Sequence, residues 1–238
     1  MGFTLPVGLI QTGVGGGSPP AFIASAFSLV GSMNNSVTVN KPTGTTLNDT
    51  MVFFYWGRSN ATQISGSPGG WTTDVSVTTV FDAIDHWAYL YHKVAGGSEP
   101  ANYTWNLNGG AGEKAGVILT YRPAHGTQLE VTGNEVITTS SASHPQSTMS
   151  TTFANARLVY AWMLNRVGAA TLNLGGWTNP AGMTERYKDN YTTLARPDVG
   201  LAIYDEARPT AGSVGTRTLT TADSDVASLG IRCAIRAA

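Results

Sequence analysis

The feature that most constrains the fold is an aromatic pattern that the chain contains twice. The run Val52–Trp56 (VFFYW) precedes a Gly-Gly-Trp-Thr motif at residues 69–72, and the run Leu158–Trp162 (LVYAW) precedes the same motif at residues 175–178. The spacing between the two tryptophans is identical in both places. This pattern predicts two divergent copies of one structural unit, each with a large aromatic face to bury.

Similar segments follow each motif, so that the copies span about residues 50–124 and 156–238. Two copies allow two arrangements. They can pair into one sandwich, in which each buries the apolar face of the other, or they can form two small tandem domains. We favour one jelly-roll-like sandwich over residues 21–238, because one copy alone would have a marginal core. Only Ser140–Pro145 resembles a linker between the copies.

Short apolar or alternating runs of strand length recur along the chain, separated by Gly, Pro, Asn and Asp. No run of helical length places apolar residues at i, i+3, i+4 and i+7. We therefore predict an all-β, antiparallel β-sandwich. The predicted strands are Ala21–Val30, Val37–Val39, Met51–Trp56, His86–Lys93, Tyr103–Trp105, Val117–Tyr121, Leu129–Thr138, Leu158–Leu164, Val199–Tyr204, Thr216–Thr221 and Val226–Ile235.

Charged residues make up 12% of the chain, about half the usual share. The formal net charge is −1 and the basic residues are scattered, so we expect no nucleic-acid partner. No segment approaches the ~18–20 apolar residues of a membrane helix, and we expect no membrane partner. The single cysteine, Cys233, excludes an internal disulfide framework and lies in an apolar run, which predicts a buried thiol.

Residues 1–20 are predicted to form an extended attachment arm. Their apolar beginning is followed by Gly15–Gly17 and then Pro19-Pro20, which is linker chemistry. An apolar segment outside a domain needs a partner to bury it, and we expect the arm to contact a neighbouring subunit. The alternative is an extra strand lying on its own domain. The partner-binding side chains would be Phe3, Leu5, Val7, Leu9 and Ile10.

The tryptophans of the repeated pattern have two possible uses. Paired glycines permit a tight turn or bulge at a strand entry, after which the tryptophan covers the core, and we favour this structural use. Alternatively, exposed rings stack on sugar in a carbohydrate-binding, lectin-like module. The candidate stacking residues are Trp71, Trp87, Trp105 and Trp177.

The histidines show no metal-ligand spacing, and we expect no metal or other cofactor. His86 and His92 lie on one face of one predicted strand, about 20 Å apart, so they cannot share a metal. His125 and His144 stand beside Gly and Pro, which predicts loop positions.

Two pairs of carboxylates, Asp82 with Asp85 and Asp205 with Glu206, leave a glycan hydrolase as a remote alternative. Asp82 with Asp85, or Asp223 with Asp225, could also ligate Ca²⁺, although no EF-type loop is present. No nucleophile elbow, P-loop or dinucleotide fingerprint occurs. The residues therefore predict a protein that is not an enzyme.

Several segments carry a resemblance to structural proteins of tailed bacteriophages and prophages. These are Gly70-Trp71-Thr72, residues 91–105 (YHKVAGGSEPANYTW), Tyr121-Arg122-Pro123, residues 180–186 and residues 211–218. They are similar to a family pattern of Gly-Trp-Thr, then YKVAGxSEPxxYTW, then a closing AYRG-like strand. The resemblance covers about residues 28–238 and implies a β-sandwich on the virion. It brings no catalytic residues, and the arm lies outside it.

Together these features favour a non-enzymatic virion structural protein on the particle surface, tail- or fibre-associated or decorating the capsid as a cement protein. Its partners would be capsid or tail subunits, copies of itself and, in the lectin alternative, a host surface glycan. The N-terminus lacks a basic segment followed by an apolar one, so we expect assembly in the host cytoplasm rather than secretion.

Overall fold

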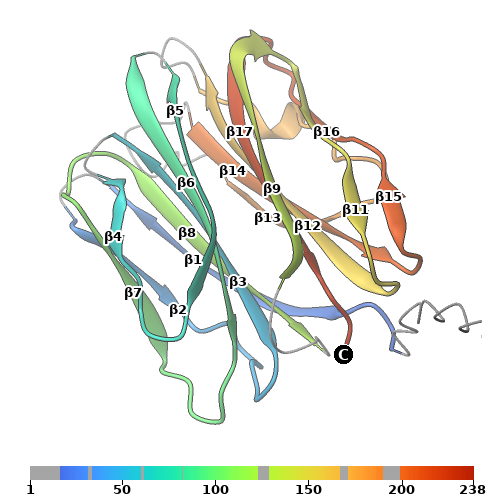
Figure 1. The fold of residues 1–238 in the computed structure, drawn as a ribbon. Coiled ribbons are helices and arrows are strands. Elements are labelled where there is room, and N and C mark those ends of the chain that lie inside the picture. Colours follow the sequence, from blue (N-terminus) through green and yellow to red (C-terminus); the bar gives the residue numbers. More distant parts are fainter. Residues whose placement is uncertain are drawn as a thin grey trace, which may run out of the picture.

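The computed structural model describes residues 17–31, 34–59, 62–81, 83–122, 129–166, 171–189 and 199–238. These residues form antiparallel strands and one short 3₁₀ turn, so the predicted all-β sandwich is confirmed (Figure 1). The first half of the chain contributes β1 (Ala21–Val30), β2 (Ser36–Asn40), β3 (Thr50–Arg58), β4 (Ile64–Gly66), β5 (Thr72–Phe81), β6 (Ile84–Val94), β7 (Asn102–Leu107) and β8 (Lys114–Arg122). The second half contributes β9 (Leu129–Ser141), β10 (Ser143–Gln146), β11 (Met149–Thr151), β12 (Ala156–Arg166), η3 (Leu174–Gly176), β13 (Thr184–Asp189), β14 (Val199–Arg208), β15 (Gly212–Val214), β16 (Arg217–Thr220) and β17 (Val226–Ile235).

Each half builds one five-stranded sheet and smaller outer sheets. The large sheets have the orders β1-β8-β3-β6-β5 and β13-β14-β12-β17-β9, and the outer sheets are β2-β7-β4, β10-β16 and β11-β15. The pairs are nested: β1 with β8, β2 with β7 and β3 with β6, then β9 with β17, β10 with β16, β11 with β15 and β12 with β14. All of these pairs are antiparallel, and each half brings together strands that lie far apart in the sequence.

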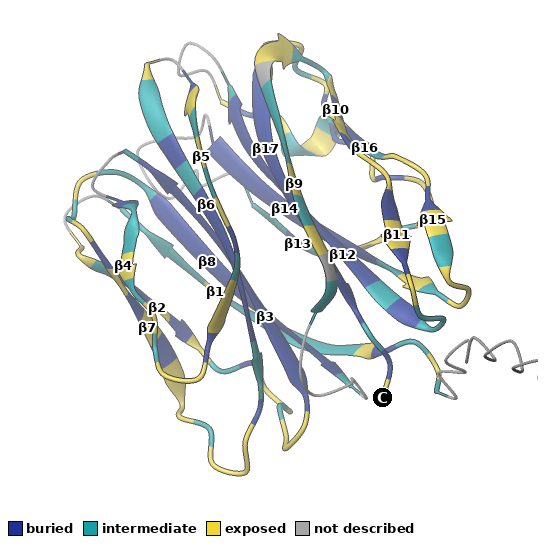
Figure 2. Cartoon of the chain, viewed as in Figure 1, coloured by how far each residue is buried: buried dark blue, intermediate teal, exposed yellow. Residues whose placement is uncertain are grey.

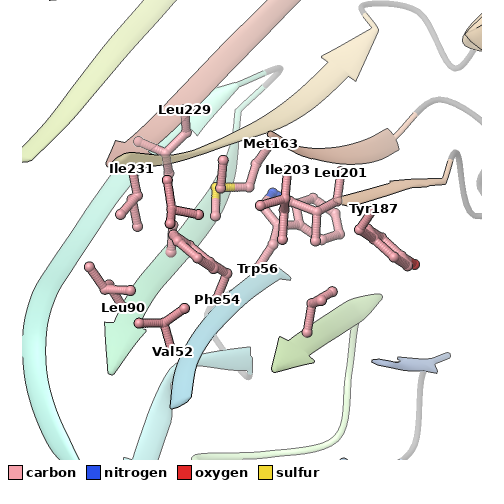
Figure 3. Packing of buried hydrophobic residues seen from close by; sticks show 14 of the residues in the cluster. Val52, Phe54, Trp56, Leu90, Met163, Tyr187, Leu201, Ile203, Leu229 and Ile231 are labelled. Atoms are coloured by element: carbon pink, nitrogen blue, oxygen red, sulfur yellow. The ribbon is translucent and has the colours of Figure 1, made fainter. Parts of the chain in front are cut away.

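The two large sheets pack face to face around a shared core. Val52, Phe54 and Trp56 of β3 meet Met163 of β12 and Ile203 of β14 in one buried cluster (Figure 3). Figure 2 shows that buried residues are concentrated in the middle strands of both sheets. Each half also encloses an apolar cluster of its own on the outer face of its large sheet. Mutual burial and separate cores, which are alternatives by sequence, are therefore both present in the structure.

Strand register matches β3 with β12 in a way that differs by one residue from the match predicted by the equal Trp-to-Trp spacing. Trp56 points into the shared core, but Trp162, its match by spacing, points into the outer cluster of the second half. Tyr55 pairs with Gly116 on β8, and Trp162 pairs with Gly230 on β17. Because a slip of one residue moves every side chain to the other face, Tyr55 and not Trp56 is the positional equivalent of Trp162.

The stretch Ser140–Pro145, expected to resemble a linker, is instead part of the sheets. Ser141 ends β9 and Ser143–Gln146 forms β10, where His144 and Gln146 are buried. His144 therefore does not lie in a loop, as its Pro neighbour had predicted. The Gln146 amide donates to the Ala161 carbonyl at 2.8 Å, which fixes this polar strand against β12.

Candidate functional site

The five predicted contact residues of the arm, Phe3, Leu5, Val7, Leu9 and Ile10, lie outside the described residues. The described chain begins at Gly17, close to the C-terminus: a Cβ on Gly17 would stand 3.2 Å from the Ala238 carbonyl oxygen. The Pro20 carbonyl accepts a hydrogen bond of 2.7 Å from Arg157 Nε on β12. The root of the arm, Gly17–Pro20, is thus held by the second half of the chain.

A buried ionic cluster joins the halves beside this root. Asp205 on β14 is fully buried and accepts from Arg186 Nε at 2.8 Å and from the Tyr121 hydroxyl of β8 at 3.1 Å. Arg157 Nη1 lies 3.5 Å from the same carboxylate. Burial, and then the Asp205 charge, raise the pKa of Tyr121, so its hydroxyl stays protonated and donates. The Arg186 guanidinium also lies 4.4 Å over the Phe22 ring, at the start of β1.

Three of the four candidate sugar-stacking tryptophans are buried, which corrects that prediction. Trp105 is fully buried and stacks on Phe53 with a centroid separation of 3.6 Å. Trp71 packs edge-on against Trp105, and Trp177 lies in the core of the second half. Both tryptophans of the Gly-Gly-Trp motif therefore serve as core residues, as predicted. Only the first motif leads directly into a strand, because Gly175 and Gly176 belong to the 3₁₀ turn η3.

Trp87 is the fourth candidate and is half-buried. It stands in a row with Tyr89 and Tyr91 on one face of β6, and its ring is nearly parallel to that of Tyr89 at 6.4 Å. Both tyrosines are buried. A sugar-binding platform of two exposed, coplanar rings is therefore not formed by these candidates.

The segment at residues 91–105 has a structural role in the connection from β6 to β7. Glu99 accepts from Lys93 Nζ at 2.8 Å, from the Tyr103 hydroxyl at 2.6 Å and from the Gly96 amide at 2.6 Å. Burial alone would raise the pKa of Glu99, but these donors outweigh it and the pKa is lowered. In the second half Arg217 binds Glu206 at 2.8 Å, so each half closes this connection with one ion pair.

Four of the carboxylates considered for glycan hydrolysis and Ca²⁺ binding, those of Asp205, Glu206, Asp223 and Asp225, are used in ion pairs. Asp205 and Glu206 are neighbours on a strand and point to opposite faces, toward Tyr121 and Arg217 respectively. Asp223 and Asp225 both pair with Arg166, at 3.0 and 2.9 Å. Asp82 lies outside the described residues. Within the described ranges, no group of three or more His, Cys, Asp or Glu side chains is arranged to hold a metal ion.

Three of the four histidines are described, and His125 is not among them. His86 is buried between Trp56 and Phe81 in the shared core, where burial lowers its pKa to about 4. His92 pairs with Asp74 at 2.7 Å. His144 reaches Thr221 Oγ1 at 3.2 Å through Nε2, and burial lowers its pKa to about 4. His86 and His144 are thus buried, and His92 is held by a carboxylate on the neighbouring strand β5.

An exposed apolar strand edge is the feature that sequence reasoning missed. β1 lies at the margin of its sheet. Phe27, near the middle of β1, is 57% exposed, although its ring centroid lies 5.2 Å from that of Tyr187 on β13. The sequence predicted the strand but not its position at the edge of the sheet, because that position depends on pairing with β8 about ninety residues later. The absence of charge along residues 21–30 was the available signal.

Comparison with protein-family models, with curated proteins and with solved structures finds no match. In the part of the chain that the structure describes, no helix is long and apolar enough to span a membrane. Residues and geometry therefore carry the functional argument.

Proposed function

We propose that the protein is a non-enzymatic structural component of a phage particle, exposed on its surface and attached through its N-terminal arm. Its partners would be capsid or tail subunits and further copies of itself. The resemblance of residues 28–238 to phage structural proteins supports this assignment. So does the way the described polar side chains are used, in ion pairs and hydrogen bonds that hold strands together.

The observation that carries the proposal is the construction of the arm root. Arg157 holds the Pro20 carbonyl, and Phe22 lies between Tyr121 and the Arg186 guanidinium. These contacts fix where the chain leaves the sandwich, and the apolar residues 3–10 lie before that point. A fixed exit preceded in the sequence by a glycine run and an apolar segment suits attachment to a neighbour.

Deletion of residues 1–16 tests the proposal, because it removes the apolar segment and keeps every contact of the root. We expect the truncated protein to fold with an unchanged far-UV circular dichroism spectrum and to be missing from purified particles. The full chain, produced in the same cells, should co-purify with the particles. Normal incorporation of the truncated protein would contradict attachment through the arm.

A further inference from the structure

We propose that the outer edge of β1, which pairs with β8 alone among the described strands, is the receptor for the arm of a second copy of this chain, which would add residues 3–10 as an extra strand beside β1. This inference rests on the proposed function and names the partner surface of the arm. It follows from the edges of the large sheets, the pattern of the arm and the direction in which the chain leaves the sandwich.

β1 differs from the other three margins of the two large sheets. Each of the others carries charge: Asp74 on β5, Glu130 and Glu135 on β9, and four charged residues on β13. β1 is ten residues long and carries none. Edge strands of monomeric proteins are usually protected by charge, and a long uncharged edge is a template for another strand.

The side chains along β1 leave part of an apolar surface uncovered. Ser25 and Phe27 lie opposite Leu119 and Val117 of β8, so they share the face that points toward the second large sheet. Phe27 projects beyond the cover that Tyr187 of β13 provides. A strand added beside β1 would place its own apolar side chains next to Phe27 and remove it from water.

The sequence of the arm suits an outermost strand. Leu5, Val7 and Leu9 alternate, so in an added strand their side chains would share one face and their backbone groups would point to one side. Pro6 lies between them, and its missing N–H would then point away from β1, where no partner is needed. The same proline would prevent a further strand from adding, so the assembly would end at one strand per edge.

The course of the chain favours a second copy over the chain's own edge. Traced backward, Phe22 lies under Arg186 of β13, Pro20 bonds to Arg157 of β12, and Gly17 meets Ala238, which follows β17. Since the sheet order is β13-β14-β12-β17, the segment moves steadily away from the margin where β1 lies. The arm therefore starts on the far side of the sheet from its own receptor edge.

Disulfide trapping between two distinguishable chains tests whether the arm of one copy adds to β1 of another, which we call the exchange. Both chains carry Cys233→Ala, which removes the native thiol. One chain carries Val7→Cys in the arm, and a second chain, with a mass tag, carries Ser25→Cys on β1. After mixing and mild oxidation, we expect a cross-linked heterodimer on a non-reducing gel. Ala26→Cys is the matched control, because it faces the opposite side of β1 and should cross-link far less.

A charge on the edge should abolish the exchange. Phe27→Lys is expected to reduce the heterodimer at least tenfold, whereas Val80→Lys should leave it unchanged. Val80 is the fair comparison, since it is 54% exposed on β5 at the other margin of the same sheet. Absence of the heterodimer, or a cross-link found only within one chain carrying both cysteines, would overturn the proposal.

These outcomes are distinguishable from failure of the proposed function. If trapping fails while deletion of residues 1–16 still prevents incorporation, the arm binds another subunit and only the β1 receptor is wrong. If trapping succeeds but the full chain does not co-purify with particles, the exchange is real and the assignment to a virion is wrong. The two assays use different materials, purified protein and assembled particles, so neither result implies the other.

Discussion

Asp205 is the residue on which the contact between the halves and the arm root converges. Its carboxylate is fully buried, and its partners come from β8, β12 and β13. A buried charge of this kind is tolerated only when donors surround it. The two arginines are partly exposed, so each keeps some water while it neutralises Asp205. The cluster sets the geometry at the place where β1 begins.

Replacement Asp205→Asn should therefore destabilise the protein strongly. Removing one member of a buried ionic cluster leaves its partners unpaired, which costs about 3–5 kcal/mol. Chemical denaturation monitored by tryptophan fluorescence would measure the change in the free energy of unfolding. Asp225→Asn is the matched control: Asp225 also pairs with arginine but is 42% exposed, and such pairs contribute roughly 0–1 kcal/mol. Equal effects of the two variants would contradict the role assigned to Asp205.

At the scale of the elements, β8 can pack closely under the Phe53 side chain because Gly116 has no side chain of its own. A Cβ there would stand 2.5 Å from the Phe53 ring, which is stacked on Trp105 and cannot move aside. Gly230 takes the corresponding place on β17, where a Cβ would meet the Gln146 amide at 2.6 Å. Each glycine lets an aromatic or amide side chain lie flat on the outer face of its large sheet.

Gly116→Ala should consequently lower the free energy of unfolding by roughly 1–3 kcal/mol, the usual cost of overpacking a dense core. Gly69→Ala provides the comparison, since a Cβ at that position has nothing within 4 Å. Thermal unfolding followed by circular dichroism would compare the two variants with the parent protein. A Gly116→Ala melting temperature equal to that of Gly69→Ala would show that Phe53 can yield.

Sequence patterns predicted the strongly apolar strands and missed several polar ones, although the polar strand at Thr216–Thr221 was predicted and is β16. Met51–Trp56 and Leu158–Leu164 lie within β3 and β12. β5 was not predicted, because Thr and Asp interrupt its valines and only pairing with β6 makes it a strand. β10 was mistaken for a linker because its buried His144 and Gln146 depend on partners from distant strands.

The candidate site could be predicted only in part, for a related reason. The core role of the Gly-Gly-Trp tryptophans was readable from local residues, whereas the predicted contact residues of the arm lie outside the described residues. The Asp205 cluster was not, because Tyr121, Arg157 and Arg186 are brought together by sheet order. Equal spacing also misaligned Trp56 with Trp162, since spacing along the chain carries no information on which face a strand presents.

At the scale of the whole molecule, the shared core makes the stability of each half depend on the other. Val52 and Leu90 of the first half and Leu201 and Ile231 of the second are buried in the same cluster. His86 lies at this seam without charge, because burial keeps its pKa near 4. Asn165 of β12 lies beside His86, so the seam is polar at this end and apolar along its centre.

The stability of the whole molecule should fall in mild acid. Buried His86 and His144 have pKa values lowered to about 4 from 6.5, so the unfolded state binds more protons between these limits. Their contribution is therefore fully present above about pH 6.5 and is lost as the pH falls to about 4, by roughly 3 kcal/mol for each histidine. Urea denaturation across this range would measure how the free energy of unfolding changes with pH. A His86→Phe variant should lose about half as much stability as the two histidines together account for. An unchanged slope in that variant would mean that carboxylates, not His86, govern the acid transition.

The path of Gly17–Phe22 across the ends of β17, β12 and β13 also decides how a pulling force would enter the protein. β1 continues directly from this segment and pairs with β8 from Ala21 opposite Arg122 to Val30 opposite Lys114. Because this segment crosses the ends of those strands, tension on the residues before Gly17 would load the contacts of Pro20 with Arg157 and of Phe22 with Arg186 before it reached the β1–β8 ladder. These side-chain contacts would therefore yield first, and the strand itself would unpair only at a higher force.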